Sequence, residues 1–199
     1  MGSVFDVGNA TRSAIGRLQR GVSPTLAGGA DEQSNGNGSL MRILPVALYY
    51  ARASTQELLN ASHQASALTH RHPRSQMACG MYCLLVTQLL RNQSPMDAYQ
   101  SAIELASADY KKDAMFSSEL KHYKRFLSGE VTRLPKDQIS SGGYVVDTLE
   151  ATVWCPMTTN TFEEAVLRAV NLGGDTDTTG TVTGGLAGLL YGIENIPKD

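Results

Sequence analysis

The sequence predicts an all-α protein, because helix-start signals recur along the chain and no segment has the pattern of a strand. Three sites place a hydroxyl cap three residues before a carboxylate: Ser54 before Glu57, Ser94 before Asp97, and Thr161 before Glu164. Apolar residues spaced three and four apart follow each cap, as on one face of a helix. Clean alternation of apolar and polar residues between turn signals is missing from the sequence.

The helices can be predicted in chain order, about nine in all. The caps at Ser54, Ser94 and Thr161 each start one, and Pro95 adds the proline favoured in a first turn. A last helix follows the acidic segment near the C-terminus. The others are predicted from apolar periodicity alone, at residues 9–19, 43–53, 74–90, 114–126 and 143–154.

The last predicted helix carries glycines four residues apart, at Gly180, Gly184, Gly188 and Gly192. This spacing places them on one stripe of the helix. Glycine destabilises a helix, so the stripe indicates the close approach of a neighbouring helix. We therefore expect this helix at the buried centre of the bundle.

Composition favours one globular domain, residues 1–199, and excludes several classes. The chain is 42% apolar and 18% charged, with a net charge of −2, which gives no electrostatic case for nucleic acid or a membrane. A signal peptide and a membrane-spanning stretch are not found in the sequence. The three cysteines are odd in number, which predicts reduced thiols and a cytoplasmic location. Cys79 and Cys83 with His70 and His72 could form a zinc site, but buried free thiols are the commoner outcome.

An acidic turn, Gly-Gly-Asp-Thr-Asp-Thr-Thr-Gly at residues 173–180, is the most informative segment. Asp175 and Asp177 with the neighbouring hydroxyls supply the oxygen ligands that Mg²⁺ and Mn²⁺ prefer, and the remaining ligands would come from elsewhere. The alternative is a structural turn in which the aspartates cap the following helix. A calcium-binding EF-hand loop starting at Asp175 would need Asp or Asn at position 179 and Glu at position 186, where the sequence has Thr179 and Leu186, so that class is excluded.

Residues 26–39 form a glycine-rich segment without apolar periodicity. It can be a plain linker, or a nest of backbone N–H groups around a phosphate or ribose. The segment lacks both the dinucleotide-binding fingerprint and the P-loop lysine.

Taken together, several motifs resemble the ADP-ribosylglycohydrolase family, which includes the dinitrogenase-reductase-activating glycohydrolases. The most specific pair is the Asn-Gly-Xaa-Xaa-Xaa-Met-Arg loop and the Gly-Gly-Asp-Xaa-Asp-Thr turn. The matching segments keep the family's order and fall at residues 6–11, 34–45, 69–73, 143–151 and 173–178.

The resemblance implies an orthogonal multi-helix bundle of the ADP-ribosylglycohydrolase type, with two Mg²⁺ or Mn²⁺ ions in a central cleft. Asp175, Asp177 and Thr178 match the family's C-terminal metal ligands, with Asp175 and Asp177 as the catalytic carboxylates. The implied reaction is metal-assisted hydrolysis of the C1″ glycosidic bond, which releases ADP-ribose from a modified substrate.

The resemblance also assigns substrate contacts, with ADP-ribose or an ADP-ribosylated protein as the partner. His70 matches a histidine close to the substrate, and Tyr144 matches an aromatic residue that stacks against it. The loop that wraps the diphosphate and ribose corresponds to Asn35, Gly36, Asn37, Gly38, Ser39 and Met41.

The sequence departs from the family at its start. Members carry a Ser/Thr-Asp-Asp metal motif there, whereas Asp6 is the only carboxylate before Asp31 and no Asp-Asp pair occurs. We therefore expect an N-terminally incomplete domain with the second ion in doubt. The alternative function is a non-catalytic ADP-ribose binder or structural relative. A missing helix would also expose core surface, which predicts self-association.

Overall fold

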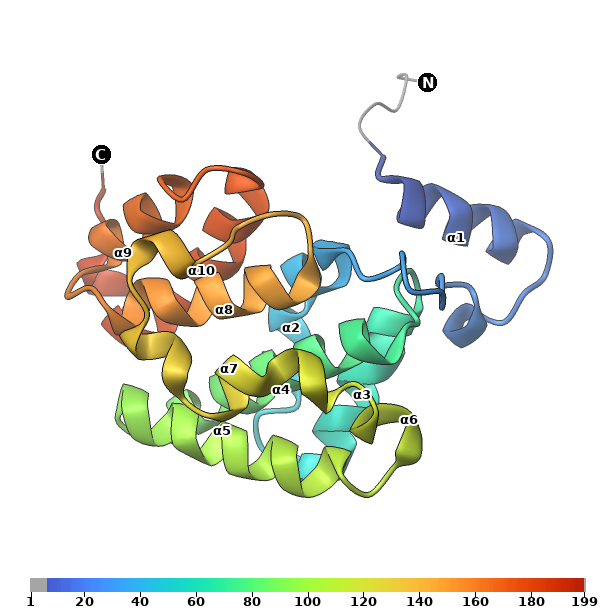
Figure 1. The fold of residues 1–199 in the computed structure, drawn as a ribbon, viewed down its shortest axis with the longest axis horizontal. Coiled ribbons are helices and arrows are strands. Elements are labelled where there is room, and N and C mark those ends of the chain that lie inside the picture. Colours follow the sequence, from blue (N-terminus) through green and yellow to red (C-terminus); the bar gives the residue numbers. More distant parts are fainter. Residues whose placement is uncertain (1–6, 199) are drawn as a thin grey trace.

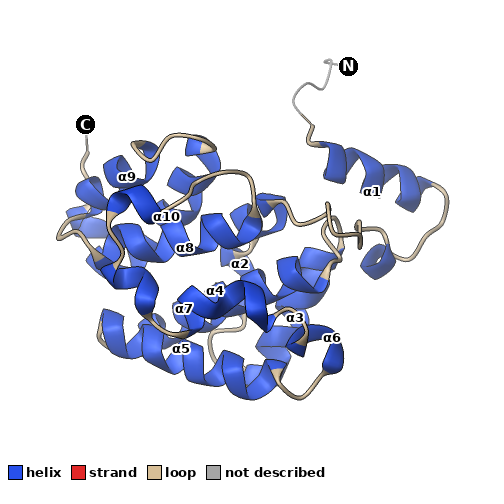
Figure 2. Ribbon diagram, viewed as in Figure 1, coloured by secondary structure: helices blue, strands red, loops and turns tan. Residues whose placement is uncertain are grey.

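The computed structural model describes residues 7–198, and this part of the chain is built from ten α-helices and six short 3-10 helices (Figure 2). Two isolated β-bridges are the only extended pairing in that range. The all-α prediction is confirmed. The α-helices are α1 (Asn9–Gln19), α2 (Leu44–Tyr49), α3 (Thr55–Ala67), α4 (Pro73–Leu90), α5 (Pro95–Tyr110), α6 (Ala114–Ser117), α7 (Lys124–Leu127), α8 (Val145–Met157), α9 (Phe162–Val170) and α10 (Thr176–Tyr191). The 3-10 helices are η1 (Pro24–Leu26), η2 (Asn37–Arg42), η3 (Leu120–Tyr123), η4 (Glu130–Arg133), η5 (Lys136–Gln138) and η6 (Ile193–Asn195).

The three caps read from the sequence all form. Ser54 and Glu57 make a full capping box at the start of α3. The Ser94 hydroxyl accepts from the Asp97 backbone N–H at α5, and Thr161 caps α9 in the same way. Each cap satisfies an N–H group that the first turn leaves unpaired, so these local signals fix where the helices begin.

Two predicted helices are shorter than expected. The helix predicted over residues 114–126 is divided into α6, η3 and α7. The hydroxyls of Ser117 and Ser118 donate to the carbonyls of Ala114 and Met115, and such local bonds compete with a continuing helix. The helix predicted over residues 43–53 ends at Tyr49.

Helix α4 lies at the middle of the bundle (Figure 1) and is buried along almost its whole length. It packs against α3, α5 and α8, and these helices share one apolar cluster. The predicted central position of α10 is therefore wrong, since α4 occupies it. The site is consequently built at the edge of the core, where α4, α8 and α10 all begin.

The glycine stripe of α10 does serve a close helix approach. An added Cβ at Gly180 would lie 3.2 Å from Val170 of α9, and those at Gly184 and Gly188 would also meet α9. Gly192 is not part of the stripe, because α10 ends before it and its φ of +80° follows the helix as a cap.

Helix α1 stands away from the other helices (Figure 1). Ala14 is its one buried residue, and Ile15 and Leu18 expose apolar side chains. The Arg17 guanidinium donates to the Ala27 carbonyl and ties the helix to the chain that follows. Among the helices that the structure describes, none has the length and apolar character needed to cross a membrane.

Candidate functional site

One cavity gathers residues from four distant parts of the sequence. It has a volume of about 630 Å³ and lies between the start of α1, the 3-10 helix η2 and the start of α10. A second cavity of about 310 Å³ adjoins it and shares Asn9, Ala10, Gly36 and His70 with it. The larger cavity is lined by Val7, Gly8, Asn9, Ala10, Thr11, Gly36, Asn37, Gly38, Met41, His70, Asp175 and Thr178. Asp6, which belongs to the first matching segment, lies outside the described residues.

The loop before η2 is pinned to the start of α8 by backbone hydrogen bonds. Gly36 and Tyr144 form an antiparallel bridge. The Asn37 N–H donates to Gly143 O at 3.0 Å, and the Val145 N–H donates to Asn35 O at 3.0 Å. These bonds fix the loop on the cavity wall, so residues 35–38 are not a plain linker.

The Asn37 side chain joins this loop to the acidic turn. Its Nδ2 donates to Asp175 Oδ2 at 2.7 Å and to Thr148 Oγ1 at 2.9 Å. Asn37 is buried and so is its bond to Thr148, whereas its bond to Asp175 is partly buried at the cavity wall. One amide group therefore sets the orientation of the Asp175 carboxylate.

The acidic turn itself is shaped by two glycines in left-handed backbone conformations, Gly173 at φ +82° and Gly174 at φ +64°. Ser141 holds the turn from outside, because its hydroxyl donates to Gly173 O at 2.7 Å and its carbonyl accepts from the Asp175 N–H at 2.8 Å. The backbone is so close that a Cβ on Gly174 would lie 2.7 Å from Ser141 O. The turn thus delivers Asp175 to the cavity in one fixed position.

The Asp175 carboxylate is held ionised. Burial raises its pKa, but the hydrogen bonds that the carboxylate accepts, first that from Asn37 and then those from Thr178, lower it by more, so the pKa lies below its usual value. Asp175 occupies the N-cap position of α10 and makes no side-chain capping bond of ordinary geometry, but the Thr178 backbone N–H helps to lower the pKa of its carboxyl. The structural-cap alternative for this residue therefore stays open beside the metal-ligand prediction.

The oxygen donors of the turn suit a hard divalent cation in kind: two carboxylates and the Thr178 hydroxyl within four consecutive residues. Asp175 and Thr178 line the cavity, whereas Asp177 is exposed and does not. Within residues 7–198 there is no group of three or more His, Cys, Asp or Glu placed to hold a metal. The turn therefore fits as part of a metal shell whose other oxygens come from outside it. The absence of such a group from these residues also contradicts the zinc alternative at Cys79, Cys83, His70 and His72.

His70 reaches the cavity as a neutral imidazole. Burial, with Arg42 nearby, lowers its pKa to about 4. Arg42 donates to Thr69 Oγ1 at 2.7 Å, and the Thr69 hydroxyl lies 2.7 Å from His70 Nδ1. Because the Thr69 oxygen accepts from Arg42, the Thr69 hydroxyl is free to donate its own proton to Nδ1. The neutral ring then carries its proton on Nε2. An added Cβ on Gly36 would lie 3.4 Å from that nitrogen, so the histidine packs directly against the loop.

The remaining predicted substrate contacts lie around the cavity rather than in its lining. Asn35 is buried, and its side chain donates to Glu32 O and accepts from the Ser75 hydroxyl. Ser39 is also buried and accepts from Ser66. Tyr144 is half-buried at the start of α8.

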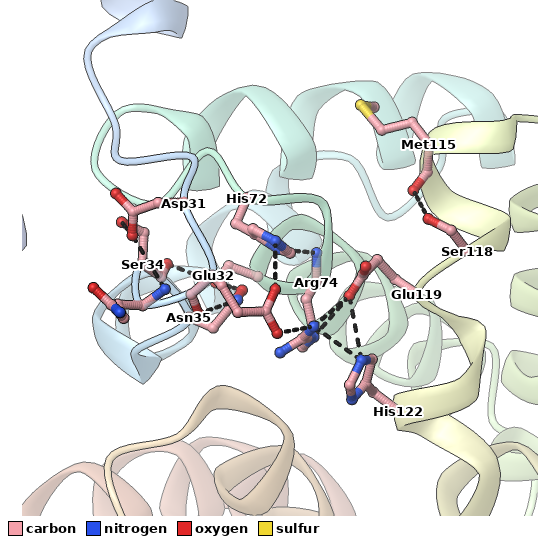
Figure 3. A network of polar contacts seen from close by, with 12 residues as sticks. Asp31, Glu32, Ser34, Asn35, His72, Arg74, Met115, Ser118, Glu119 and His122 are labelled. Atoms are coloured by element: carbon pink, nitrogen blue, oxygen red, sulfur yellow. Dashed lines mark hydrogen bonds and ion pairs between the residues drawn. The ribbon is translucent and has the colours of Figure 1, made fainter.

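Sequence reasoning missed a cluster of charged side chains around the buried Arg74, next to the Asn35 loop (Figure 3). It centres on Arg74, which contacts Glu32, Glu119 and His122. No local motif could have revealed it, because Glu32 and Glu119 come from opposite sides of α4 in the sequence. Thr148 was missed as well, although it lies within the matched segment 143–151.

Comparisons with known proteins all point to one family and cover nearly the whole chain. A family model described as ADP-ribosylglycohydrolase matches residues 1–199. The ADP-ribosylarginine hydrolase Tri1 of Serratia proteamaculans is 33% identical over 99% of this chain and 50% of its own length. The ADP-ribosyl-[dinitrogen reductase] glycohydrolase of Rhodospirillum rubrum is 33% identical over 97% of this chain and 58% of its own. A solved ADP-ribosylglycohydrolase-related protein complex superposes with a TM-score of 0.76 and 32% identity, covering 96% of this chain and 61% of that one. The chain thus spans about half the length of the curated relatives it matches.

Proposed function

The chain belongs to the ADP-ribosylglycohydrolase family, and from this we propose that it hydrolyses the C1″ glycosidic bond of an ADP-ribosylated substrate with the help of Mg²⁺ or Mn²⁺. The observation that carries the proposal is the hydrogen bond from Asn37 to Asp175, which unites the predicted substrate loop and the predicted metal turn at one cavity. We propose that residues 1–199 act as one domain, because one apolar core joins the helices of the described residues.

Asp175, Asp177 and Thr178 would hold the metal through their oxygens. The ion would supply Lewis acidity beside the ribose, with its remaining ligands from water, substrate or further protein oxygens. The Asn37 hydrogen bond keeps Asp175 ionised and oriented, as a carboxylate ligand must be.

The loop and His70 would bind the ligand. Gly36 and Gly38 present backbone without side chains, which lets an oxygen-rich ligand approach closely. His70 would donate a hydrogen bond from Nε2 to a ligand oxygen, because its low pKa leaves it uncharged near neutral pH. The histidine would therefore orient the substrate rather than supply a proton.

The linkage to test first is ADP-ribosylarginine, since two relatives at 33% and 34% identity are ADP-ribosylarginine hydrolases. An ADP-ribosylated protein would be the natural partner, and a cytoplasmic location fits the three buried free cysteines. Helix α1 exposes the apolar side chains of Ile15 and Leu18, and we therefore retain self-association of the chain as a prediction.

A second candidate is an ADP-ribose binder without catalysis. It is favoured by the small number of candidate ligands: the acidic turn supplies two carboxylates, and residues 7–198 hold no cluster of three acidic, histidine or cysteine ligands. The two candidates share the cavity and differ in turnover.

The proposed hydrolase activity is tested by measuring release of ADP-ribose from a protein that is ADP-ribosylated on arginine, with Mn²⁺ present. Asp175→Asn and EDTA should each abolish release, while Asp137→Asn, which changes an exposed aspartate of η5, should not. Calorimetry with ADP-ribose on the same samples separates the candidates. Binding without release supports the binder, and neither binding nor release contradicts both.

A further inference from the structure

Arg74, in the first turn of α4, is a buried arginine with three charged or titratable partners. It is 4% exposed. Its Nε donates to Glu119 Oε2 at 2.8 Å, and its Nη2 lies 2.7 Å from Glu32 Oε1 and 2.9 Å from His122 Nε2 (Figure 3). The guanidinium fork therefore connects three segments of the chain: the loop before η2, α4, and the stretch around η3.

His72 strengthens the connection to the loop. Its Nδ1 accepts from the Arg74 backbone N–H at 3.2 Å and caps α4, while its Nε2 lies 3.3 Å from Glu32 Oε2. Each oxygen of the Glu32 carboxylate thus has its own partner. Glu32 would otherwise be mobile, because its side chain is 68% exposed.

Glu32 leads directly to the cavity. Its backbone carbonyl accepts from Asn35 Nδ2 at 3.0 Å, and the Asn35 carbonyl in turn accepts from the Val145 N–H. The next residues of the loop, Gly36 to Gly38, line the cavity, and Asn37 holds Asp175. A short path of contacts therefore runs from the Arg74 guanidinium to the acidic turn.

Arg74 also approaches the other side of the loop. Its guanidinium carbon lies 5.8 Å from the ring centroid of Tyr144, within the range of a cation–π contact. Tyr144 pairs with Gly36 in the β-bridge. Arg74 thus contacts the loop at Glu32 and also contacts Tyr144, the residue that pairs with the loop at Gly36.

We propose that Arg74 is a positioning residue, which fixes Glu32 and Tyr144 and so holds the segment 32–38 in its ligand-binding shape. The assignment deepens the proposed function and rests on it. Stability alone does not explain this ion pair, because the free energy lost when an arginine is removed from water is as large as the free energy gained from its partners. Here one partner, Glu32, belongs to the segment that continues into the cavity-lining loop, and another, Tyr144, pairs with that loop.

The test compares Arg74→Met with Arg74→Lys and with Arg125→Met in the 199-residue chain. Lysine keeps the charge but lacks the fork, so it can pair with one carboxylate at a time. Arg125→Met is the matched control, because it also removes an arginine paired with a carboxylate, Glu150, whose side chain is 8% exposed. The readouts are ADP-ribose affinity by calorimetry and the exchange rates of the Asn37 and Val145 amide protons.

For Arg74→Met we expect ADP-ribose affinity to fall at least about tenfold, as loss of charge-assisted hydrogen bonds implies. Both amides should exchange at least about tenfold faster, since their hydrogen bonds fasten the loop to α8. Arg74→Lys should lie between this variant and the wild type, and Arg125→Met should match the wild type in both readouts.

The proposal is overturned if Arg74→Met and Arg125→Met affect the loop amides and the affinity equally. If the wild type binds no ADP-ribose, the proposed function fails, and the amide exchange alone decides the role of Arg74. If Arg74→Met does not fold, Glu32→Gln takes its place. It removes the carboxylate that pairs with Arg74 and His72 from an exposed side chain, and unchanged amide exchange in that variant overturns the proposal.

Discussion

Gly173 and Gly174 offer a direct test of how the acidic turn is held. Both glycines have positive φ, so an alanine at either position is strained by about 1–2 kcal/mol. Both substitutions also remove the same freedom from the unfolded chain, and that contribution cancels when they are compared. The difference between the variants therefore reports what the added methyl group meets in the folded protein.

The surroundings of the two glycines differ sharply. A Cβ at Gly173 would have no heavy atom within 4 Å, whereas a Cβ at Gly174 would lie 2.7 Å from Ser141 O, a backbone atom. Relieving that contact moves Ser141 away and weakens its hydrogen bond from the Asp175 N–H. Overpacking of about 1–3 kcal/mol, with about 1 kcal/mol for the hydrogen bond, should make Gly174→Ala about 2 kcal/mol or more less stable than Gly173→Ala.

Urea unfolding of the two variants and the wild type measures this difference. Torsional strain alone predicts no such gap, and it even favours the opposite order, because φ of +64° at Gly174 is closer to the left-handed minimum near +57° than φ of +82° at Gly173. A result in which Gly173→Ala is equally or more destabilising would refute the close-contact argument. Mn²⁺ affinity should fall with Gly174→Ala, since the same contact positions Asp175.

Three further predictions concern stability. Burial lowers the pKa of His63 to about 4, so below about pH 6.5 the unfolded chain binds a proton that the folded chain does not. The free energy of unfolding should therefore fall by up to about 3 kcal/mol between about pH 6.5 and pH 4. Urea unfolding should show a smaller loss in His63→Gln. Gly80→Ala places a Cβ 2.0 Å from the hydroxyl of buried Tyr110 and should destabilise by about 1–3 kcal/mol in spite of alanine's helix propensity, and an unchanged melting temperature would contradict this. Thr183→Val removes a buried hydroxyl without a hydrogen-bond partner among the described residues and should stabilise by about 1 kcal/mol in calorimetric melting, whereas a loss of stability would show that the hydroxyl has a partner.

The sequence predicted the helix starts well because the signals are local. A hydroxyl and a carboxylate three residues apart determine a cap whatever the rest of the chain does, as at Ser54 and Ser94. Helix ends were harder, since the break after α6 depends on serine side chains bonding to nearby carbonyls. Apolar periodicity continued past that break and concealed it.

The candidate site was predictable as motifs but not as geometry. Asp175 and Asn37 stood out in the sequence, yet their hydrogen bond joins residues 138 positions apart. The same holds for Arg74, whose partners on either side are more than forty residues distant. A buried ion pair between separate segments leaves no periodic pattern, so only the folded chain reveals it.

The bond from Asn37 to Asp175 also bears on how the protein folds. Closing a loop of 138 residues carries an entropic cost that neighbouring helices such as α3 and α4 do not face when they pair. Local contacts of that kind form early, and contacts between remote segments come late. The cavity is therefore completed near the end of folding, and the appearance of ligand binding during refolding would time the last step of assembly rather than the formation of the helices.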